Sequence, residues 1–494
     1  MALGRRKPKQ EPLFITPDQQ RRAPAHVFYD ALEGLLVEAG FDEFVEALCK
    51  PYFAERGRPS IPPGRYFRML IAGYFEDIDS QRGIEWRFQD SLSLQAFLGL
   101  APDERVPDHS SLTRTRQRYP QEVFDEVFRF VLGLAESKGL MKGESVAVDA
   151  TLLEANAAMR SIVRRDTGDS YQEWLRKLIL EEEGNANPSA EELARFDRAR
   201  SKGREGDDKG PGGKGPGDEG KGAPSKKAKP AKRVSNKEWE SKTDPDSRIA
   251  KMKNGSTHLA YKAENVVDLE TDLLLAAEIE TADTGDTASM MPSLLAAQGN
   301  LLDCAEERVI GEVVADKGYH KAALLHELKE HGVRTYIPER KERRKRRWKN
   351  KPEGWKTAFH GNRQRMRTAK GRRLQRRRSE LIERTFAHMC GTGGGRRMHV
   401  RGLKAVRKRW TSLAFARNLG VILRALTGVG TARSLQDVGR GRLDRNAAMG
   451  RRICDNFAAS ITIAAQMAMW LRDFPQPITR LVTTRHLRPP AAAA

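Results

Sequence analysis

Cysteine is scarce and scattered in this sequence of 494 residues. The four cysteines, Cys49, Cys304, Cys390 and Cys454, form no C-x-x-C pair. Their spacing therefore excludes a zinc site or a dithiol redox centre built from paired cysteines. Isolated thiols are typical of proteins in a reducing compartment, so we expect buried cysteines and a cytoplasmic location.

Long apolar runs are also rare. The N-terminus carries charged residues and lacks the apolar core of a signal peptide. The longest apolar stretch, residues 453–471, contains Asp455, Asn456 and Gln466. Polar side chains within such a stretch favour a packed helix over a membrane span, so the sequence predicts no membrane partner.

Acidic residues are also too few to balance the basic ones. The sequence has 66 Asp and Glu against 88 Lys and Arg, and its formal net charge is +22. The excess is concentrated in residues 339–378, which contain 19 Lys or Arg and 3 acids. Trp348, Trp355 and Phe359 are interspersed among these cations. Cations bind phosphates and rings stack on bases, so this segment predicts contact with double-stranded DNA, the alternative being a solvated basic loop.

Apolar residues at helical spacing, separated by Pro and Gly, run through the first part of the chain. They predict a small all-helical domain over residues 1–140, which binds DNA, mediates dimerisation or supports its neighbour. Residues 185–240 are rich in Gly, Pro, Lys and acids, so we expect an insertion without fixed structure there. Residues 426–494 are interpreted as a C-terminal helical tail.

Residues 141–425 change to strand patterns mixed with helices. Apolar strands are predicted over 145–149, 258–267, 273–279, 309–314 and 333–337. The second and third strands form a hairpin, whereas the last two are joined by a helix and must lie parallel. The sequence thus predicts an α/β fold, with a mixed sheet flanked by helices.

Three acids in this region suit a metal site. Asp149 and Asp316 each follow an apolar strand, and ligand sites in such sheets lie at the carboxyl ends of strands. On a helical wheel for the helix around 374–389, Glu383 falls about 60° beyond the apolar stripe and Glu380 about 100° beyond it. We prefer Glu383 and keep Glu380 as the alternative. Three carboxylates can hold two Mg²⁺ ions, with Mn²⁺ as a substitute, for attack on phosphorus.

The motifs around these acids resemble those of the DDE transposases of bacterial insertion sequences. The matching motifs are Ala147-Val-Asp149-Ala-Thr, Val314-Ala-Asp316-Lys-Gly-Tyr319, Ile382-Glu383-Arg-Thr-Phe386 and Arg401-Gly-Leu-Lys404. The stretch from Gly57 to Leu112 resembles the family's helical N-terminal domain. One departure is that Ser379 and Cys390 stand at positions around Glu383 where many relatives carry other side chains, with Arg378 and Arg384 as neighbouring sources of charge.

The resemblance implies an RNase H-like catalytic domain and cleavage at terminal inverted repeats with transfer into target DNA by a homodimer or larger assembly. The predicted catalytic and metal-binding residues are Asp149, Asp316 and Glu383. The predicted DNA-binding residues are Lys345, Arg346, Arg347, Trp348, Arg377, Arg378, Arg384 and Lys404. Two other functions stay open, namely a catalytically inactive DNA-binding derivative and a metal-dependent nuclease that cuts without joining.

Two further features have plainer interpretations. His320, His388 and His399 lack the spacing of metal ligands, so we expect surface or core histidines. In the apolar helix near residues 413–423, Arg417 and Asn418 either contact DNA or form polar edges of a core-facing helix.

Overall fold

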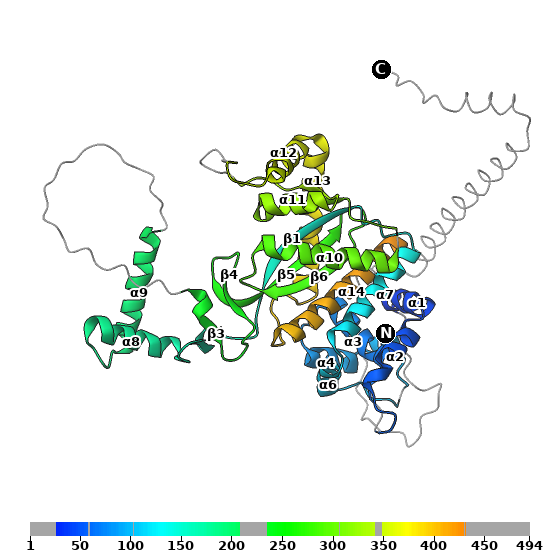
Figure 1. Cartoon of the computed structure of the whole chain (residues 1–494). Helices are drawn as coiled ribbons and strands as arrows, with labels where there is room; N and C mark the ends of the chain where they lie inside the picture. Colours follow the sequence, from blue (N-terminus) through cyan, green and yellow to red (C-terminus); the bar gives the residue numbers. More distant parts are fainter. Residues whose placement is uncertain are drawn as a thin grey trace, which may run out of the picture.

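The computed structural model describes residues 26–57, 60–101, 103–207, 235–305, 307–340, 348–428 and 430, without the side chains of 200–207. Within these residues a helical region packs against one end of a mixed sheet (Figure 1). The segment predicted as a C-terminal tail lies almost wholly outside the described residues.

The helical region extends from residue 27 to residue 137. Its α-helices are α1 (Val27–Glu38), α2 (Phe41–Cys49), α3 (Pro63–Phe75), α4 (Gln81–Asp90), α5 (Leu92–Phe97), α6 (His109–Arg118) and α7 (Gln121–Ser137), and the 3₁₀ helix η1 (Lys50–Tyr52) follows α2. The side chain of Asp108 caps α6 by accepting a hydrogen bond of 2.9 Å from the Ser111 N–H. The predicted all-helical region is confirmed.

The sheet combines antiparallel and parallel pairs. Its strands are β1 (Ser145–Glu154), β4 (Arg248–Lys251), β5 (Thr257–Asp268), β6 (Leu274–Thr281), β7 (Glu312–Ala315) and β8 (Arg334–Tyr336), in the order β4-β5-β1-β7-β8 with β6 also on β5. β5 is antiparallel to β1, β4 and β6, whereas β7 is parallel to β1 and β8. The predicted hairpin, the predicted parallel pair and the α/β class are therefore confirmed.

Helices cover both faces of this sheet. They are α10 (Asp286–Cys304), α11 (Ala322–Glu330), α12 (Glu353–Arg367), α13 (Ala369–Ala387) and α14 (Leu403–Thr427), with the 3₁₀ helix η4 (Lys317–Tyr319) after β7 and the π-helix η5 (His388–Thr392) after α13. On one face, Lys262 of β5 donates to the Ser289 hydroxyl of α10 at 2.9 Å. On the other, the indole N–H of Trp410 of α14 donates to the side-chain oxygen Oδ1 of Asn265 of β5 at 3.1 Å.

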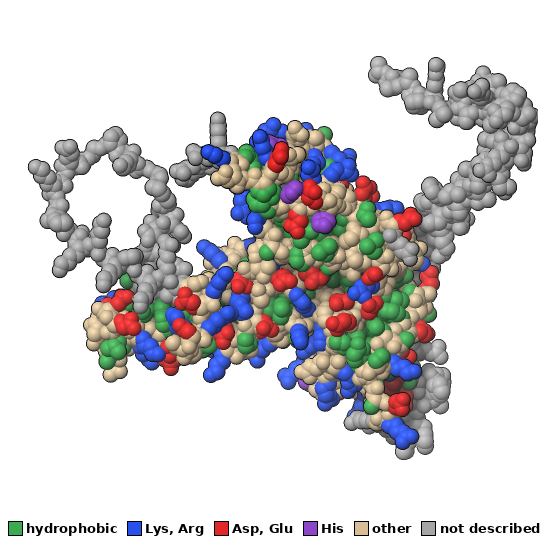
Figure 2. Space-filling view, in the orientation of Figure 1, with side chains coloured by type: hydrophobic (Ala, Val, Ile, Leu, Met, Phe, Trp, Pro, Cys, Tyr) green, Lys and Arg blue, Asp and Glu red, His purple; other side chains and the backbone are tan. Residues whose placement is uncertain are grey.

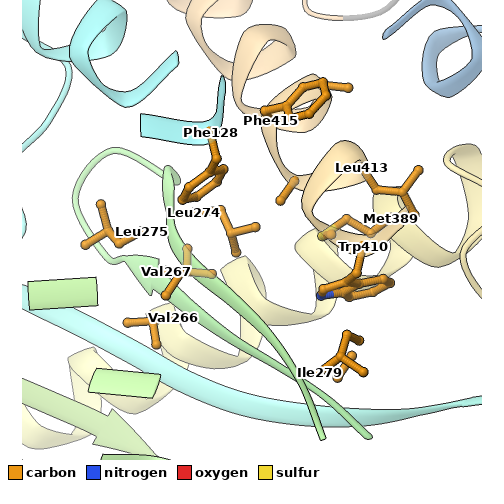
Figure 3. Packing of buried hydrophobic residues seen from close by; sticks show 14 of the residues in the cluster. Phe128, Val266, Val267, Leu274, Leu275, Ile279, Met389, Trp410, Leu413 and Phe415 are labelled. Carbon is orange, nitrogen blue, oxygen red and sulfur yellow. The ribbon is translucent and has the colours of Figure 1, made fainter. Parts of the chain in front are cut away.

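The core continues from the helical region into the sheet through α14. Phe128 of α7 lies beside Leu274 of β6, and Trp410 of α14 lies beside Ile279 of β6 (Figure 3). The boundary near residue 140 therefore separates two kinds of secondary structure, and not two cores. None of the described helices is long and apolar enough to cross a membrane.

The bounds of the predicted insertion need correction. Between β1 and β4 the chain forms η2 (Met159–Ser161), β2 (Ile162–Arg164), α8 (Tyr171–Glu183), α9 (Ala190–Asp207), η3 (Asn236–Glu238) and β3 (Trp239–Ser241). Thus α9, η3 and β3 occupy part of 185–240, and residues 208–234 lie outside the described residues. Composition averaged over the whole range hides the helix-forming Ala, Glu and Arg at its start and Trp239 at its end, whose ring packs edge-on against Trp174.

The basic segment over 339–378 is also more ordered than a loop. α12 and the first half of α13 take up most of its described residues. Lys and Arg side chains gather around these two helices on the face seen in Figure 2. Helices hold these cations in fixed directions, which a solvated loop would not.

Candidate active site

Asp149 and Asp316 come at the same level of two neighbouring parallel strands. The parallel pairing of β1 with β7 ends at Val148 opposite Ala315, and each acid is the next residue. Neighbouring strands lie about 4.8 Å apart, so the two residues are adjacent. The prediction that Asp149 ends its strand is wrong, because β1 continues to Glu154 by pairing with β5. Asp149 instead marks the point where β1 leaves the buried core, since residues 145–148 are buried and Asp149 is partly exposed.

A guanidinium group neutralises Asp149. Arg378 Nη1 of α13 lies 2.8 Å from Asp149 Oδ2, and the Ala150 N–H donates to Asp149 Oδ1 at 2.8 Å. Burial raises the pKa of Asp149 and the nearby Asp316 adds to the rise, whereas Arg378 opposes it. A cation therefore already occupies one side of this carboxylate. Arg378 was predicted to contact DNA, and that role stays a prediction.

Asp316 begins a tight turn with a glycine that allows close approach. Its Oδ1 accepts a hydrogen bond of 2.5 Å from the Gly318 N–H. A Cβ at Gly318 would lie 2.5 Å from Asp286 Oδ2 and 2.7 Å from Asp316 Oδ1, which is too close for any other residue without a shift. Gly318 thus lies between the carboxylates of Asp316 and Asp286, and Asp286 belongs to the first turn of α10.

Behind Asp316 lies a buried polar cluster that sequence reasoning did not identify as part of the site. Glu264 of β5, fully buried, accepts hydrogen bonds from the hydroxyls of Tyr319 at 2.9 Å and Ser289 at 2.5 Å. Lys262 Nζ lies 3.5 Å from Glu264 Oε2 and 2.8 Å from Asp286 Oδ1. The turn after Asp316 is therefore tied to β5. Lys262 and Glu264 lie two residues apart on one side of β5 and alternate with apolar residues, a signal that could have identified the cluster.

The candidates for the third acid differ in what they contact on α13. Glu380 Oε1 accepts a hydrogen bond of 2.6 Å from Arg384, and Glu380 Oε2 lies 3.7 Å from Arg377. Glu383 is exposed, and its side chain has no ion pair or hydrogen bond within the described part of the chain. It follows Arg378 by five residues, roughly 7.5 Å along the helix axis.

The structure therefore brings Asp149 and Asp316 together but not Glu383. Among the residues that the structure describes, no group of three or more His, Cys, Asp or Glu side chains is arranged to hold a metal ion. The two aspartates nevertheless supply the hard oxygen donors that divalent cations such as Mg²⁺ prefer. An exposed glutamate without a partner can reach a ligand without first breaking an ion pair.

Other predicted DNA-binding residues have varied surroundings. Lys345, Arg346 and Arg347 lie outside the described residues. Trp348 packs its ring on Phe359 with 5.1 Å between centroids, and Lys404 is exposed at the start of α14. Arg377 donates to the Leu269 carbonyl at 3.1 Å, and Arg384 Nη1 lies 3.5 Å from Asp272 Oδ2. Packing within the protein thus engages part of this set, and their contact with DNA stays a prediction.

Comparison with protein-family models gives two matches. Residues 17–118 match the model described as Transposase domain (DUF772), and residues 224–419 match the Transposase DDE domain. The second match contains Asp316 and Glu383 and starts after Asp149. A DDE domain implies an RNase H-like fold, in agreement with the mixed sheet and its flanking helices. A search of curated proteins finds no match to the chain.

Proposed function

Because the chain belongs to the DDE transposases, we propose that it cleaves DNA at the ends of an insertion sequence and transfers the cut strands into target DNA. The main support is the pair formed by Asp149 and Asp316, which follow directly on the last residues of the parallel register of β1 and β7. Metal-assisted phosphodiester transesterification uses carboxylates placed in this way, because they hold the cations that stabilise the charge developing on oxygen.

We propose Asp149, Asp316 and Glu383 as ligands of divalent cations, with Mg²⁺ as the natural ion and Mn²⁺ as a substitute. Enzymes of this family generally use such ions. The bound metal would activate the attacking oxygen and stabilise the leaving one. The fit rests on the oxygen donors of the two adjacent aspartates, and Arg378 would have to release Asp149 Oδ2 for a metal to bind there. Glu383 is preferred to Glu380 because Glu380 is already paired with arginines.

Other side chains of the site position these acids. Tyr319 and Glu264 hold the turn that carries Asp316, and Lys262 holds Asp286 beside it. The cations around α12 and α13 supply positive charge next to the acids, which favours binding of the phosphate backbone and release of its counterions.

Two alternatives use the same features differently. A nuclease would use the same acids and metal but only water as the nucleophile, so joining is favoured here by family membership alone. An inactive DNA-binding derivative would keep the basic helices and need no acids. The inactive derivative does not explain why Glu383 is exposed or why Asp149 and Asp316 lie on adjacent strands, so these features favour the enzyme.

The test is a cleavage and joining assay on DNA that carries the element ends, with Mg²⁺ or Mn²⁺. Wild type is compared with Asp149→Asn, Asp316→Asn and Glu383→Gln, and Glu380→Gln on the same helix is the matched control. We expect joined products from wild type and Glu380→Gln only, with DNA binding kept by all five proteins. Activity in Glu383→Gln but not in Glu380→Gln would reassign the third ligand.

The same assay separates the alternatives. Wild-type protein that cuts but never joins would be a nuclease, and one that binds without cutting would be an inactive derivative. Pairing two element ends requires a dimer or larger assembly, so light scattering of the complex on paired end DNA should show at least two chains. A monomeric complex would contradict this assembly.

A further inference from the structure

A cavity of about 360 Å³ lies between the helical region and α14, away from the acids. Tyr66 of α3, Arg82 of α4 and Arg116 of α6 line one side of it. Lys408 and Arg409 of α14 line the other. The walls thus come from segments far apart in the sequence, and only the folded chain forms this cavity.

Positive charge in the cavity exceeds negative charge. Asp79 is the one carboxylate among the described lining residues, and its Oδ2 lies 2.9 Å from His399 Nε2. No described carboxylate lies within ion-pair distance of Arg116 or Arg409. Burial lowers the pKa of Arg116 and lowers that of Arg409 to about 10. The fold therefore holds two partly buried guanidinium groups with no described carboxylate at ion-pair distance, an arrangement that a bound anion would stabilise.

A hydroxyl group in the same cavity also lacks a partner. Tyr66 is fully buried, and its hydroxyl has no hydrogen-bond partner in the described structure. Burial raises the pKa of Tyr66, whereas Arg116 and Arg409 are near enough to act against the rise. A buried donor without a partner destabilises the folded chain. An oxygen-rich anion would accept from this hydroxyl and from Arg116 together.

Two of the lining cations are fixed in place by the backbone. Lys408 Nζ donates to the carbonyls of Arg116 at 3.0 Å and Tyr119 at 2.5 Å. Arg409 Nη2 donates to the carbonyls of Ile78 at 3.4 Å and Gly393 at 3.2 Å. These contacts hold the charges at the cavity wall without neutralising them, so the cavity is prepared for an anion before the anion binds.

We propose that this cavity binds a phosphate group of the DNA backbone, an inference that rests on the proposed function. Phosphate fits because its oxygens accept hydrogen bonds only, and the cavity offers guanidinium and hydroxyl donors. DNA, as opposed to a free anion, fits the position of the cavity. Asn156 Nδ2, just beyond β1, donates to the carbonyl of the lining residue His399 at 3.2 Å. The Met398 N–H, next to His399, also donates to the Glu154 carbonyl at 2.8 Å, so the cavity wall is joined to the end of β1, the strand that carries Asp149.

The test measures DNA binding and thermal stability in the Asp149→Asn background without metal, so that no cleavage intervenes. Arg116→Gln should weaken binding of an end-DNA duplex about tenfold and reduce the slope of log affinity against log salt by roughly one. It should leave the Tm unchanged or higher, because it removes an uncompensated charge. Arg114→Gln, exposed on the same helix, is the matched control and should change affinity less than twofold.

A second variant, Tyr66→Phe, keeps the ring and removes only the unpaired hydroxyl. It should weaken DNA binding severalfold without lowering the Tm. A fall in Tm with unchanged DNA affinity in both variants would assign the cavity a structural role and overturn the proposal.

Inorganic phosphate as a second probe separates the source of the anion. A rise in wild-type Tm with phosphate that Arg116→Gln loses, with unchanged DNA affinity, would mean a small-anion site and would overturn the DNA assignment. Binding in the Asp149→Asn background does not depend on cleavage. Loss of the cavity effect therefore leaves the proposed transposition intact, and failure of the cleavage assay leaves the cavity result intact.

Discussion

Two arginine–aspartate pairs lie on or beside α13, namely Arg378 with Asp149 and Arg417 with Asp272. They differ in the number of contacts that the carboxylate makes. Asp272, in the turn between β5 and β6, receives Arg417 at 2.6 Å on Oδ1 and has Arg384 and Arg424 at 3.5 and 3.6 Å from Oδ2. Arg417 also donates to the Asp272 carbonyl at 2.5 Å. Asp149 has one arginine and one backbone N–H.

Burial separates the two pairs further. The side chains of Arg417 and Asp272 are 1% and 9% exposed, against 12% and 28% for Arg378 and Asp149. A carboxylate that is almost fully buried among three arginines is closed to a ligand, so it serves the fold. A carboxylate at the edge of the core with one exchangeable cation keeps the capacity to bind a ligand, and this difference marks Asp149 as functional.

The largest expected effect comes from Asp149→Asn, which tests the functional half of the comparison. It should reduce cleavage by at least about 1,000-fold, because a lost metal ligand removes several kcal/mol of stabilisation of the transition state. The thermal midpoint should fall less than in Asp272→Asn, since the pair of Asp149 and Arg378 is less buried than that of Asp272 and Arg417. Cleavage kinetics and differential scanning calorimetry measure the two quantities. Asp272→Asn is the control and should show the opposite pattern.

Next comes Arg417→Met, which tests the structural half. Removing this buried partner leaves the Asp272 carboxylate without its shortest contacts and should lower the free energy of unfolding by about 3–5 kcal/mol. Cleavage per folded molecule should stay within about twofold, since no reacting group is touched. Denaturant titration gives the first value. Arg424→Met, with a longer and more exposed contact, should cost about 1 kcal/mol or less, and an equal loss would contradict the comparison.

A smaller effect is expected for Glu264→Gln, which weakens the support of Asp316. Cleavage should fall about 10- to 100-fold, as for residues that orient metal ligands. The affinity for end DNA, measured by fluorescence anisotropy, should not change. Tyr319→Phe removes the same hydrogen bond from the other side and should lower cleavage in the same direction. Unchanged cleavage in both variants would show that the buried cluster serves the fold alone.

The smallest effect belongs to Arg378→Gln, which frees Asp149 from its guanidinium. Without DNA, the affinity for Mn²⁺ should rise about fivefold, the equivalent of ~1 kcal/mol, because the guanidinium no longer competes for Asp149. Isothermal titration calorimetry measures this affinity. Arg376→Gln, exposed on the same helix, should leave it unchanged. Weaker Mn²⁺ binding in Arg378→Gln would mean that the arginine orients Asp149 for the metal instead of competing with it.

Most of the fold could be predicted from patterns among residues that are close together in the sequence. Alternating and helical periodicity correctly predicted the hairpin of β5 and β6, the parallel arrangement of β7 and β8, and the helical region before residue 140. The interpretation of Arg417 and Asn418 as parts of a core-facing helix is also confirmed, since both are buried. Averaged composition was less informative, because it hid α9 within the predicted insertion.

The site was predictable only in part. Asp149 and Asp316 could be chosen because each acid follows an apolar run, a property of adjacent residues. The partners of these acids could not be chosen from the sequence. Arg378 lies 229 positions from Asp149, which it contacts, and Glu264 lies 52 positions from Asp316, whose turn it supports. Pairing across such distances depends on strand order and helix placement, which no local pattern encodes.

By itself, the sequence determined the chemical inventory of this protein: an excess of cations, three candidate acids and the strands and helices that carry them. Such features depend on residue type and short-range periodicity. Only the tertiary structure decided that Asp149 lies level with Asp316, that Arg378 occupies the side of Asp149, and that a cavity with uncompensated cations forms beneath α14. Burial and unpaired charge arise when distant segments pack together, so they exist only in the folded chain.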